Sequence, residues 1–423
     1  MNLPKMVRIE QRFDVSHISD MAGETRRLID QSRLLRKIKK GDRVAVGVGS
    51  RGITGQVEVV RTICTLLKGI GTNPFIFPAM GSHGGGTSEG QEQVLHSLGI
   101  SPDSVGVEIK SEATGVHIGE SEEGIPVYVD QNALNADHVI LINRIKPHTK
   151  FKGPVESGIL KMLSVGMGKV AGATILHRQA VKSGFPEVIH LVAQKVVEIL
   201  PFLFGIGIIE GPEKKIHSLS LLTKETLSEE EKLLEKAKQI MTRIPFDEFD
   251  LLIVDEIGKD ISGTGMDTNV TGRNRDILGD FCIHPKIHRI FVRDLSEKTG
   301  GNANGIGLAD FTTRRLVDKI DFKTTYTNSL TAMSPEKAAV PVTLANDREA
   351  IAAALDSIGI SDGREAKIVR IKNTSELAQL HISETLLPAL PGVKGGNIEI
   401  TSQPEPMIFD TARNLQTESV PQD

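Results

Sequence analysis

The sequence contains no tryptophan, two tyrosines and two cysteines, and aromatic residues make up 4% of its 423 positions. So few rings offer no stacking platform for nucleic-acid bases. The net charge of −4 gives no general attraction for polyanions or for an anionic membrane. Cys64 and Cys282 lie in apolar surroundings and form no C-x-x-C pair, which argues against a thiolate zinc site or an iron–sulfur cluster. We expect buried thiols in a reducing cytosol.

The chain also lacks any run of the roughly 20 apolar residues that a membrane-spanning helix needs. Its start, "MNLPKMVRIEQRFDVSH", has an early acidic residue and no apolar core, so it does not read as a secretion signal. We therefore expect a cytoplasmic protein with neither membrane nor nucleic acid as a partner. Hydrophobic residues at 39% and charged residues at 25% describe a globular chain, and its length predicts two or three domains.

The order of elements is the main evidence for the fold. Strand-like segments at 42–50, 73–81 and 136–144 alternate with helix-like segments at 55–71, 88–100 and 185–200. Such alternation favours a parallel sheet covered by helices. We predict an α/β fold with two α/β domains, the first holding a Rossmann-like parallel sheet with helices on both faces. The active site is expected in the crevice between the domains.

The second half repeats the alternation after a charged stretch at 223–244, which predicts a solvated connector helix. Strands are expected at 249–258, 288–296 and 365–373, and a helix at 347–359. These segments predict an N-terminal cofactor-binding domain at 1–240, a C-terminal α/β domain at 241–400 and a frayed polar tail at 401–423. The stretch 388–397 reads as a turn-rich link.

Two glycine-rich loops, "GSRGITG" (49–55) and "GSHGGGT" (81–87), each follow a strand and precede a helix. In open α/β sheets, such loops bind ligands, and helix N-termini favour anions. Two such loops from two strands could share one crevice. His83 lies in the second loop and titrates near neutrality, so it suits substrate contact or general-base work; an exposed loop histidine is the alternative. Neither loop carries a P-loop or a clean dinucleotide fingerprint.

The segment 143–179 has the highest density of reactive side chains. His148 follows a strand, Lys161 lies among apolar residues, and His177 comes sixteen positions later. A desolvated lysine can be nucleophilic, whereas a snorkelling lysine and ordinary surface histidines are the structural alternative. No H-x-x-x-H pair or nearby carboxylate completes a zinc site. In the second half, the polar loop 259–276 either closes over the crevice or forms a turn cluster.

Taken in order, these motifs resemble the nickel-dependent lactate racemase family. That family has a T-R pair after its first strand, a G-x-H loop after the next, a P-H motif after a third, and a glycine-flanked lysine sixteen residues before a histidine. The sequence here reads "GSRGITG", "GSHGGGT", "IKPH" and "SGILKMLSVGMGKVAGATILH". The resemblance covers most of residues 40–180.

The resemblance implies a nickel-pincer nucleotide, a pyridinium-3,5-bisthiocarboxylic acid mononucleotide, joined to Lys161 through a thioamide. His177 would be the protein ligand to nickel, and His83 and His148 the acid–base pair. Arg51 would hold an anionic group of substrate or cofactor. The other candidates are Ser50, Gly52, Gly84 and Gly85 for the cofactor, and Asp267 and Asn269 for the substrate.

The implied reaction is racemisation or epimerisation of a 2-hydroxy acid. One histidine removes the hydroxyl proton while a hydride passes from Cα to the cofactor, and the hydride returns to the other face. The implied partners are this small-molecule substrate and the enzymes that make the cofactor; self-association is left open. An isomerase is thus expected.

The sequence departs from the family pattern around the lysine. The His148–Lys161 spacing is longer, the segment reads "GPVESGILK", and Lys146 replaces an acidic residue. These differences predict a 2-hydroxy acid that is larger than lactate or differently charged. A nicotinamide-dependent dehydrogenase is one alternative, but it needs a dinucleotide fingerprint. A non-catalytic cofactor-binding protein is another, and it needs only Lys161 and His177.

Overall fold

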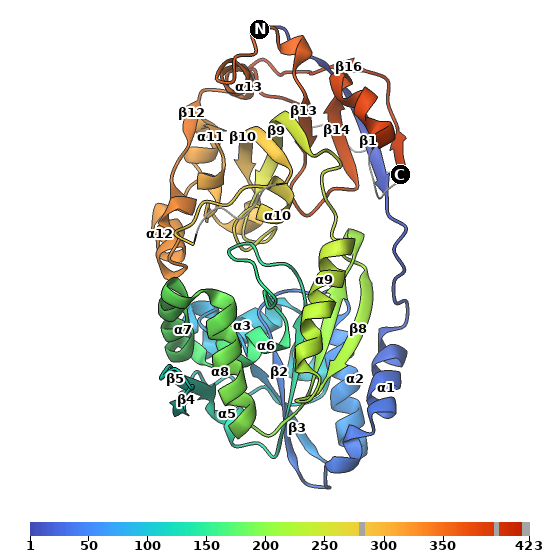
Figure 1. Ribbon diagram of the computed structural model, residues 1–423, viewed down its shortest axis with the longest axis vertical. Helices are drawn as coiled ribbons and strands as arrows, with labels where there is room; N and C mark the ends of the chain where they lie inside the picture. Colours follow the sequence, from blue (N-terminus) through green and yellow to red (C-terminus); the bar gives the residue numbers. More distant parts are fainter. Residues whose placement is uncertain (279–283, 393–396, 417–423) are drawn as a thin grey trace. The chain divides into compact units, whose positions relative to one another are not determined.

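The computed structural model describes residues 1–278, 284–392 and 397–416 (Figure 1). Contacts divide the chain into an N-terminal unit, Val15–Met241, and a C-terminal unit that combines Met1–Asp14 with Thr242–Asp423. Cys282 and part of the predicted link at 388–397 lie outside the described residues.

The N-terminal unit is built on a sheet in the order β3-β2-β6-β7-β8. Neighbours from β3 to β7 are parallel, and β8 is antiparallel to β7. Its strands are β2 (Arg43–Val48), β3 (Asn73–Pro78), β6 (His138–Arg144), β7 (Phe202–Glu210) and β8 (Ile216–Leu222), with a separate hairpin of β4 (Gly115–Glu120) and β5 (Pro126–Asp130). The predicted α/β fold is confirmed.

The helices of this unit are α1 (Met21–Ser32), α2 (Gln56–Gly69), α3 (Ser88–Ser97), α4 (Pro102–Val105), α5 (Gln131–Leu134), α6 (Ile159–Lys161), α7 (Lys169–Ser183), α8 (Phe185–Ile199) and α9 (Glu230–Ile240). A π-helix, Met162–Gly166, joins α6 to the segment before α7.

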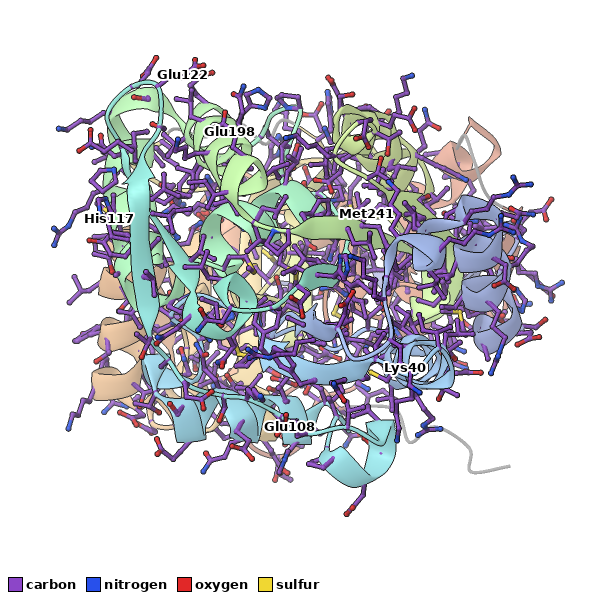
Figure 2. The ribbon with its side chains drawn as sticks, turned by 90° about the horizontal axis from the view of Figure 1, so that it is seen from below. Lys40, Glu108, His117, Glu122, Glu198 and Met241 are labelled. Carbon is purple, nitrogen blue, oxygen red and sulfur yellow. The ribbon has the colours of Figure 1, made fainter. Side chains whose placement is uncertain are left out.

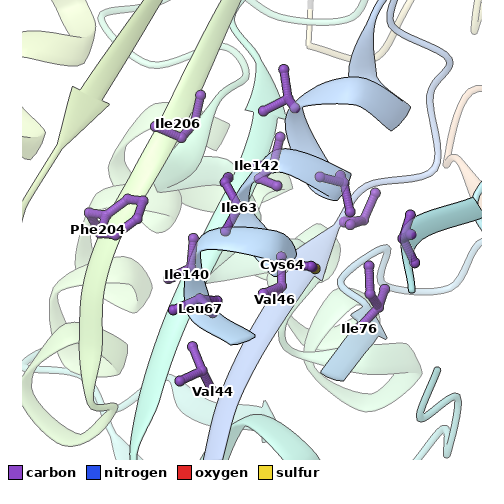
Figure 3. Packing of buried hydrophobic residues seen from close by; sticks show 14 of the residues in the cluster. Val44, Val46, Ile63, Cys64, Leu67, Ile76, Ile140, Ile142, Phe204 and Ile206 are labelled. Atoms are coloured by element: carbon purple, nitrogen blue, oxygen red, sulfur yellow. The ribbon is translucent and has the colours of Figure 1, made fainter. Parts of the chain in front are cut away.

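Both faces of this sheet are covered, which is why its strands read as continuous apolar runs. On one face, side chains of β2, β6 and β7 pack against α2, as Figure 3 shows for Ile63 and Leu67. On the other face, a Cβ at Gly205 would lie 2.7 Å from the side chain of Ile159, so α6 covers β7 there. Cys64 lies on α2 and is fully buried in the core between this helix and the sheet. Burial raises the pKa of its thiol to about 12. The expected burial of the thiol is confirmed at Cys64.

The strand order also locates a ligand site. From β2 the chain moves to β3 on one side, and then returns across β2 to β6 on the other. The loops that follow β2 and β6 therefore diverge at a topological switch point, where open α/β sheets form their binding crevices.

The C-terminal unit contains a sheet in the order β12-β11-β10-β9-β13-β14-β1-β15, with β16 paired to β1. Its strands are β1 (Lys5–Arg12), β9 (Glu248–Ile257), β10 (Lys286–Leu295), β11 (Phe311–Thr313), β12 (Val342–Leu344), β13 (Ile368–Ile371), β14 (Gln379–Ser383), β15 (Asn397–Ile400) and β16 (Glu405–Pro406). Its helices are α10 (Thr268–Thr271), α11 (Arg314–Val317), α12 (Phe322–Thr331) and α13 (Asp347–Asp356).

The division of the chain differs from the predicted boundaries of 1–240, 241–400 and 401–423 in two places. β1 pairs with β14 and β15, so the first residues belong to the C-terminal unit. The described part of the tail is also attached, because β16 pairs with β1 and Leu415 is 5% exposed. The sequence of a single strand shows its polarity pattern but not its partner, so this pairing could not be predicted.

No single helix among the described residues is long and apolar enough to cross a membrane; a pair bent by 107°, Ile159–Gly166 with Lys169–Ser183, meets that test only when taken together. A shallow hollow lies beside β4 and α8, at the edge where Figure 2 labels Glu122 and Glu198. It is lined by Glu120, Ser121, Glu122, Leu191, Gln194, Lys195 and Glu198. The predicted site residues lie elsewhere.

Candidate functional site

The loops that follow β2 and β3 meet through a side-chain contact. Ser50 lies two residues beyond β2, and its hydroxyl forms a hydrogen bond with Nδ1 of His83, five residues beyond β3. His83 is exposed. The structure therefore brings together the two glycine-rich loops that the sequence predicted to share a crevice.

The glycine run after His83 has a conformational cause. Gly84, Gly85 and Gly86 take positive φ values of 64°, 67° and 72°, a conformation that glycine adopts without strain. A Cβ at Gly84 would lie 2.5 Å from the carbonyl of Gly90, whereas a Cβ at Gly85 would meet nothing within 4 Å. The run thus turns the chain from His83 into α3. A cofactor-binding role for Gly84 and Gly85 stays a prediction.

The segment that carries Lys161 packs against both of these loops. The N–H of Gly81 donates to the carbonyl of Gly166 at 3.0 Å. A Cβ at Gly166 would lie 2.6 Å from the carbonyl oxygen of Ala79, and one at Gly49 would lie 3.2 Å from Cε of Met162. Glycine at these positions permits the close approach. A π-helical turn, as at 162–166, occurs frequently at functional sites.

A series of four aromatic rings joins the remaining candidates. His148 and Phe151 have ring centroids 4.4 Å apart, Phe151 and Phe185 stack at 4.5 Å, and His177 meets Phe185 edge-on at 5.4 Å. Nζ of Lys161 lies 5.1 Å from the centroid of Phe151. The structure thus groups His148, Lys161 and His177 around two phenylalanines that sequence reasoning missed.

Their signal was weak but present. Phe185 begins the helix predicted at 185–200 and lies on its apolar face with Val188 and Ile189, whereas Phe151 lies in a loop where periodicity gave no reason to expect a core ring.

The electrostatics of the group favour uncharged forms. Desolvation lowers the pKa of Lys161 to about 7, and the nearby positive charge of Arg51 adds to this effect. Desolvation lowers the pKa of His177 to about 4, with further contributions from Lys150 and Lys161. Arg51 lies on an exposed part of its loop. Desolvation by the surrounding protein lowers the pKa of its guanidinium, and the positive charge of Arg144 lowers it further. Near neutral pH the imidazole of His177 is therefore uncharged, and a large share of Lys161 is the free amine.

The tautomer of His148 follows from its hydrogen bonds. The N–H of Lys150 donates to Nδ1 of His148 at 3.0 Å. Nδ1 therefore carries a lone pair, and the neutral ring holds its proton on Nε2. The backbone N–H of His148 donates to Oε2 of Glu156 at 2.7 Å. The first bond orients the ring as a donor through Nε2, and the second holds the backbone that carries it.

The donor set fits an anionic group that brings most of its own metal ligands. In residues 1–278, 284–392 and 397–416, no cluster of three or more histidine, cysteine, aspartate or glutamate side chains has the geometry for a metal ion. His177 supplies a neutral imidazole, the form that ligates metals. Lys161 supplies an amine available for acylation, and Arg51 and Lys150 supply positive charge for anionic substituents.

Asp267 and Asn269 lie in the C-terminal unit. Asp267 is the N-cap of α10, where its carboxylate accepts from the N–H and the amide nitrogen of Asn269 at 3.0 and 2.9 Å. The N–H of Asp267 donates to the Thr374 hydroxyl at 2.9 Å. A substrate-binding role for the two residues stays a prediction.

Comparison with known proteins bears on the N-terminal unit first. Residues 16–159 match the family model of the lactate racemase N-terminal domain. The N-terminal unit is thus similar to the N-terminal domain of the lactate racemases. The matched range includes Ser50, Arg51, His83 and His148 and ends two residues before Lys161. The predicted resemblance to the lactate racemase family is therefore confirmed.

A second finding concerns the whole chain. The apoprotein structure of lactate racemase from Thermoanaerobacterium thermosaccharolyticum is similar with a TM-score of 0.52 and 13% identity, covering 87% of this chain and 94% of that chain. At this identity the likeness shows that the two proteins share a fold. Comparison with curated proteins finds no match.

Proposed function

We propose that this lactate racemase homologue is a racemase or epimerase of a 2-hydroxy acid that works with a nickel-pincer nucleotide bound to Lys161. The observation that carries the proposal is the environment of Lys161. Its amine has a pKa lowered to about 7, lies beside the ring series that includes His148 and His177, and feels the charge of Arg51. An amine, a neutral imidazole and an anion clamp are the groups that this cofactor and substrate require.

The cofactor, when bound, supplies an electrophilic centre that takes up and returns a hydride. Lys161 attaches it, and His177 is the protein ligand to its metal. Arg51 binds the substrate carboxylate through its two-pronged guanidinium. Lys150, which is 8% exposed and lies 5.7 Å from the Phe185 ring centroid, adds positive charge to the same region.

The two histidines move the hydroxyl proton. His83, held at Nδ1 by Ser50, removes the proton from one enantiomer through Nε2. His148 holds its proton on Nε2 because Nδ1 accepts from the N–H of Lys150, so the neutral ring donates a hydrogen bond to the keto oxygen. It transfers a proton to that oxygen only as the imidazolium, which requires Nδ1 to release the N–H of Lys150 and take up a proton, and the ring returns to the neutral form after the transfer. The roles exchange in the reverse direction, which is what a racemase requires of a paired acid and base.

The substrate we propose is a 2-hydroxy acid that is larger than lactate or carries a different charge. Lys146 stands where the family pattern has an acidic residue, and Lys150 lies within the same loop. Added positive charge favours a substrate with more negative charge. A panel of 2-hydroxy acids with and without a second anionic group, assayed by loss of optical rotation, tests this choice.

The decisive experiment is intact mass and nickel analysis of protein co-expressed with the cofactor biosynthesis enzymes. We expect a mass increase confined to the Lys161 peptide, with close to one nickel per chain. Lys161→Arg should abolish both, whereas Lys182→Arg, an exposed position on α7, should change neither. An unmodified Lys161 without nickel, in a host where a known lactate racemase loads, refutes the proposal.

A second experiment separates the racemase from a cofactor-binding protein without activity. His83→Ala and His148→Ala should each retain nickel and lose turnover by about 10²–10⁴-fold, the usual contribution of a general acid or base. Turnover that survives both substitutions would remove the acid–base assignment.

A further inference from the structure

The start of α9 is buried against the helix that carries Lys161. Glu230 is 1% exposed. Its Oε2 accepts from the N–H of Ile159 at 2.6 Å, and its Oε1 accepts from the N–H of Leu160 at 3.3 Å. Figure 1 shows α9 running beside α6. The predicted solvated connector is therefore wrong at this position, because α9 presents a buried carboxylate to a neighbouring helix.

These bonds replace a missing cap. The first N–H groups of a helix need acceptors, which a serine, threonine, aspartate or asparagine at the N-cap usually supplies. The N-cap of α6 is Gly158, with φ of 101° and no side chain. A Cβ there would lie 2.6 Å from Cδ of Glu230. Glycine at 158 thus makes room for a cap that comes from 72 residues further along the chain.

The other end of α9 reaches the loop that carries His148. Nζ of Lys238 lies 3.0 Å from Oε1 of Glu156, whose side chain is 0% exposed. The opposite oxygen of that carboxylate accepts from the N–H of His148 at 2.7 Å. Glu230 and Lys238 are eight residues apart, about 12 Å along a helix. Helix α9 therefore contacts the start of α6, which carries Lys161, and also Glu156, which binds the backbone of His148.

The contacted segment is the one that departs from the family pattern. In "GPVESGILK", Glu156 and Gly158 make the contacts described above. Ser157 lies between them, and its hydroxyl accepts from the N–H of Lys146 and donates to the carbonyl of Lys146, both at 2.7 Å. Nδ2 of Asn143 donates to the carbonyl of Gly158 at 2.7 Å. The longer spacing between His148 and Lys161 thus holds the residues that bind this segment to β6 and to α9.

We propose that Glu230 and Lys238 are positioning residues of the proposed reaction. Glu230 caps and orients the helix of Lys161, and Lys238 orients His148 through Glu156. The roles assigned to Lys161 and His148 rest on the proposed function, but the orientation of their segments by α9 can be measured without activity.

The environment of Glu230 indicates which substitution should preserve its hydrogen bonds to α6. Burial raises its pKa to about 8, so near neutral pH a large share of the carboxyl is uncharged. A glutamine offers the same carbonyl oxygen to the N–H of Ile159 with no charge to desolvate. Glu230→Gln should therefore preserve the cap, and Glu230→Ala should remove it.

The first test measures the pH profile of amine labelling at Lys161 in the full-length apo chain. In Glu230→Ala, the freed N–H groups draw water to α6, so the midpoint of the profile should rise by at least about one pH unit. Cofactor loading on co-expression should fall at least tenfold. Glu230→Gln and the matched control Glu231→Ala, an exposed neighbour, should stay within twofold of wild type in loading. A profile of Glu230→Ala that matches the control, or a Glu230→Gln chain that fails as Glu230→Ala does, overturns the cap.

The second test compares Lys238→Met with Lys236→Met, an exposed position on the same helix. Lys238→Met should accelerate hydrogen exchange at the His148 amide at least tenfold, leave Lys161 labelling unchanged, and lower kcat of the loaded enzyme with little change in KM. Unchanged exchange at His148 overturns this half of the proposal. If the wild type binds no cofactor, the proposed function fails, while labelling and exchange still decide the positioning roles.

Discussion

The most direct prediction concerns the charge of Lys161 in the apo chain. Labelling of the intact protein with a small amine-reactive reagent, followed by peptide mass analysis between pH 5 and 10, yields a separate rate for each lysine. Lys161 should titrate with a midpoint near 7, because desolvation and then Arg51 lower its pKa to about that value. The labelling rate of an ordinary exposed lysine should still be rising at pH 10.

The size of the effect follows from the fraction of free amine. At pH 7 roughly half of Lys161 is uncharged, compared with roughly 0.04% of a lysine with a pKa of about 10.4, a ratio on the order of a thousand. A less basic amine is also a weaker nucleophile, and the reagent reaches a buried amine less easily than an exposed one. The ratio of labelling rates should therefore be smaller than the ratio of free amine. We expect Lys161 to be labelled at least about tenfold faster than Lys182 at pH 7.

Two controls sharpen the result. Arg51→Met removes one positive charge near the amine, so the midpoint should rise. Denatured protein should lose the difference between Lys161 and other lysines. A midpoint above about 9.5 in the folded wild type would contradict the desolvated environment, and with it the main support for attachment of a cofactor at this lysine.

Three further predictions concern stability. Lys161→Met should flatten the dependence of unfolding free energy on pH in chemical denaturation: the folded amine titrates near 7 and the unfolded one near 10.5, so the wild type should gain stability as pH rises between these values. Gly166→Ala should cost about 1–3 kcal/mol because its Cβ meets the Ala79 carbonyl at 2.6 Å, whereas Gly69→Ala, with nothing within 4 Å, should be neutral or stabilising by urea unfolding. Lys169→Met should lower the free energy of unfolding by about 3–5 kcal/mol, because it leaves the Asp130 carboxylate, 2.6 Å from Nζ, buried without its cation. The double variant with Asp130→Asn should recover part of this stability. Equal losses in the single and the double variant would contradict the pairing.

The sequence located β2, β3 and β6 of the N-terminal unit, because strands buried on both faces appear as unbroken apolar runs, but it did not identify β7, β8 or the hairpin of β4 and β5. The positions after those strands also predicted that loops 49–55 and 81–87 would meet, and the Ser50–His83 hydrogen bond confirms this contact. The roles of the predicted site residues stay predictions, although the structure groups His148, Lys161 and His177.

What the sequence missed depends on contacts between distant positions. Phe151 and Phe185 are ordinary apolar residues until the fold stacks them. Glu230 reads as one charge among many in "SEEEKLLEKAK", and only the placement of α9 reveals that this carboxylate is buried while Glu231 is exposed. The pairing of β1 is a similar case, because its partners lie more than 360 residues away. Local patterns carry no information about such partners.

The pairing of β1 has a consequence for synthesis. The chain begins with a strand of the C-terminal unit, then completes the whole N-terminal unit, and only afterwards makes β14 and β15, between which β1 lies. On the ribosome, β1 is therefore made more than 360 residues before β14 and β15, the strands that satisfy its hydrogen-bonding edges. The N-terminal unit is continuous in sequence and can fold during this interval. β14 and β15 then pair with β1 on its two sides, so the sheet of the C-terminal unit can be completed only after the whole N-terminal unit has been made.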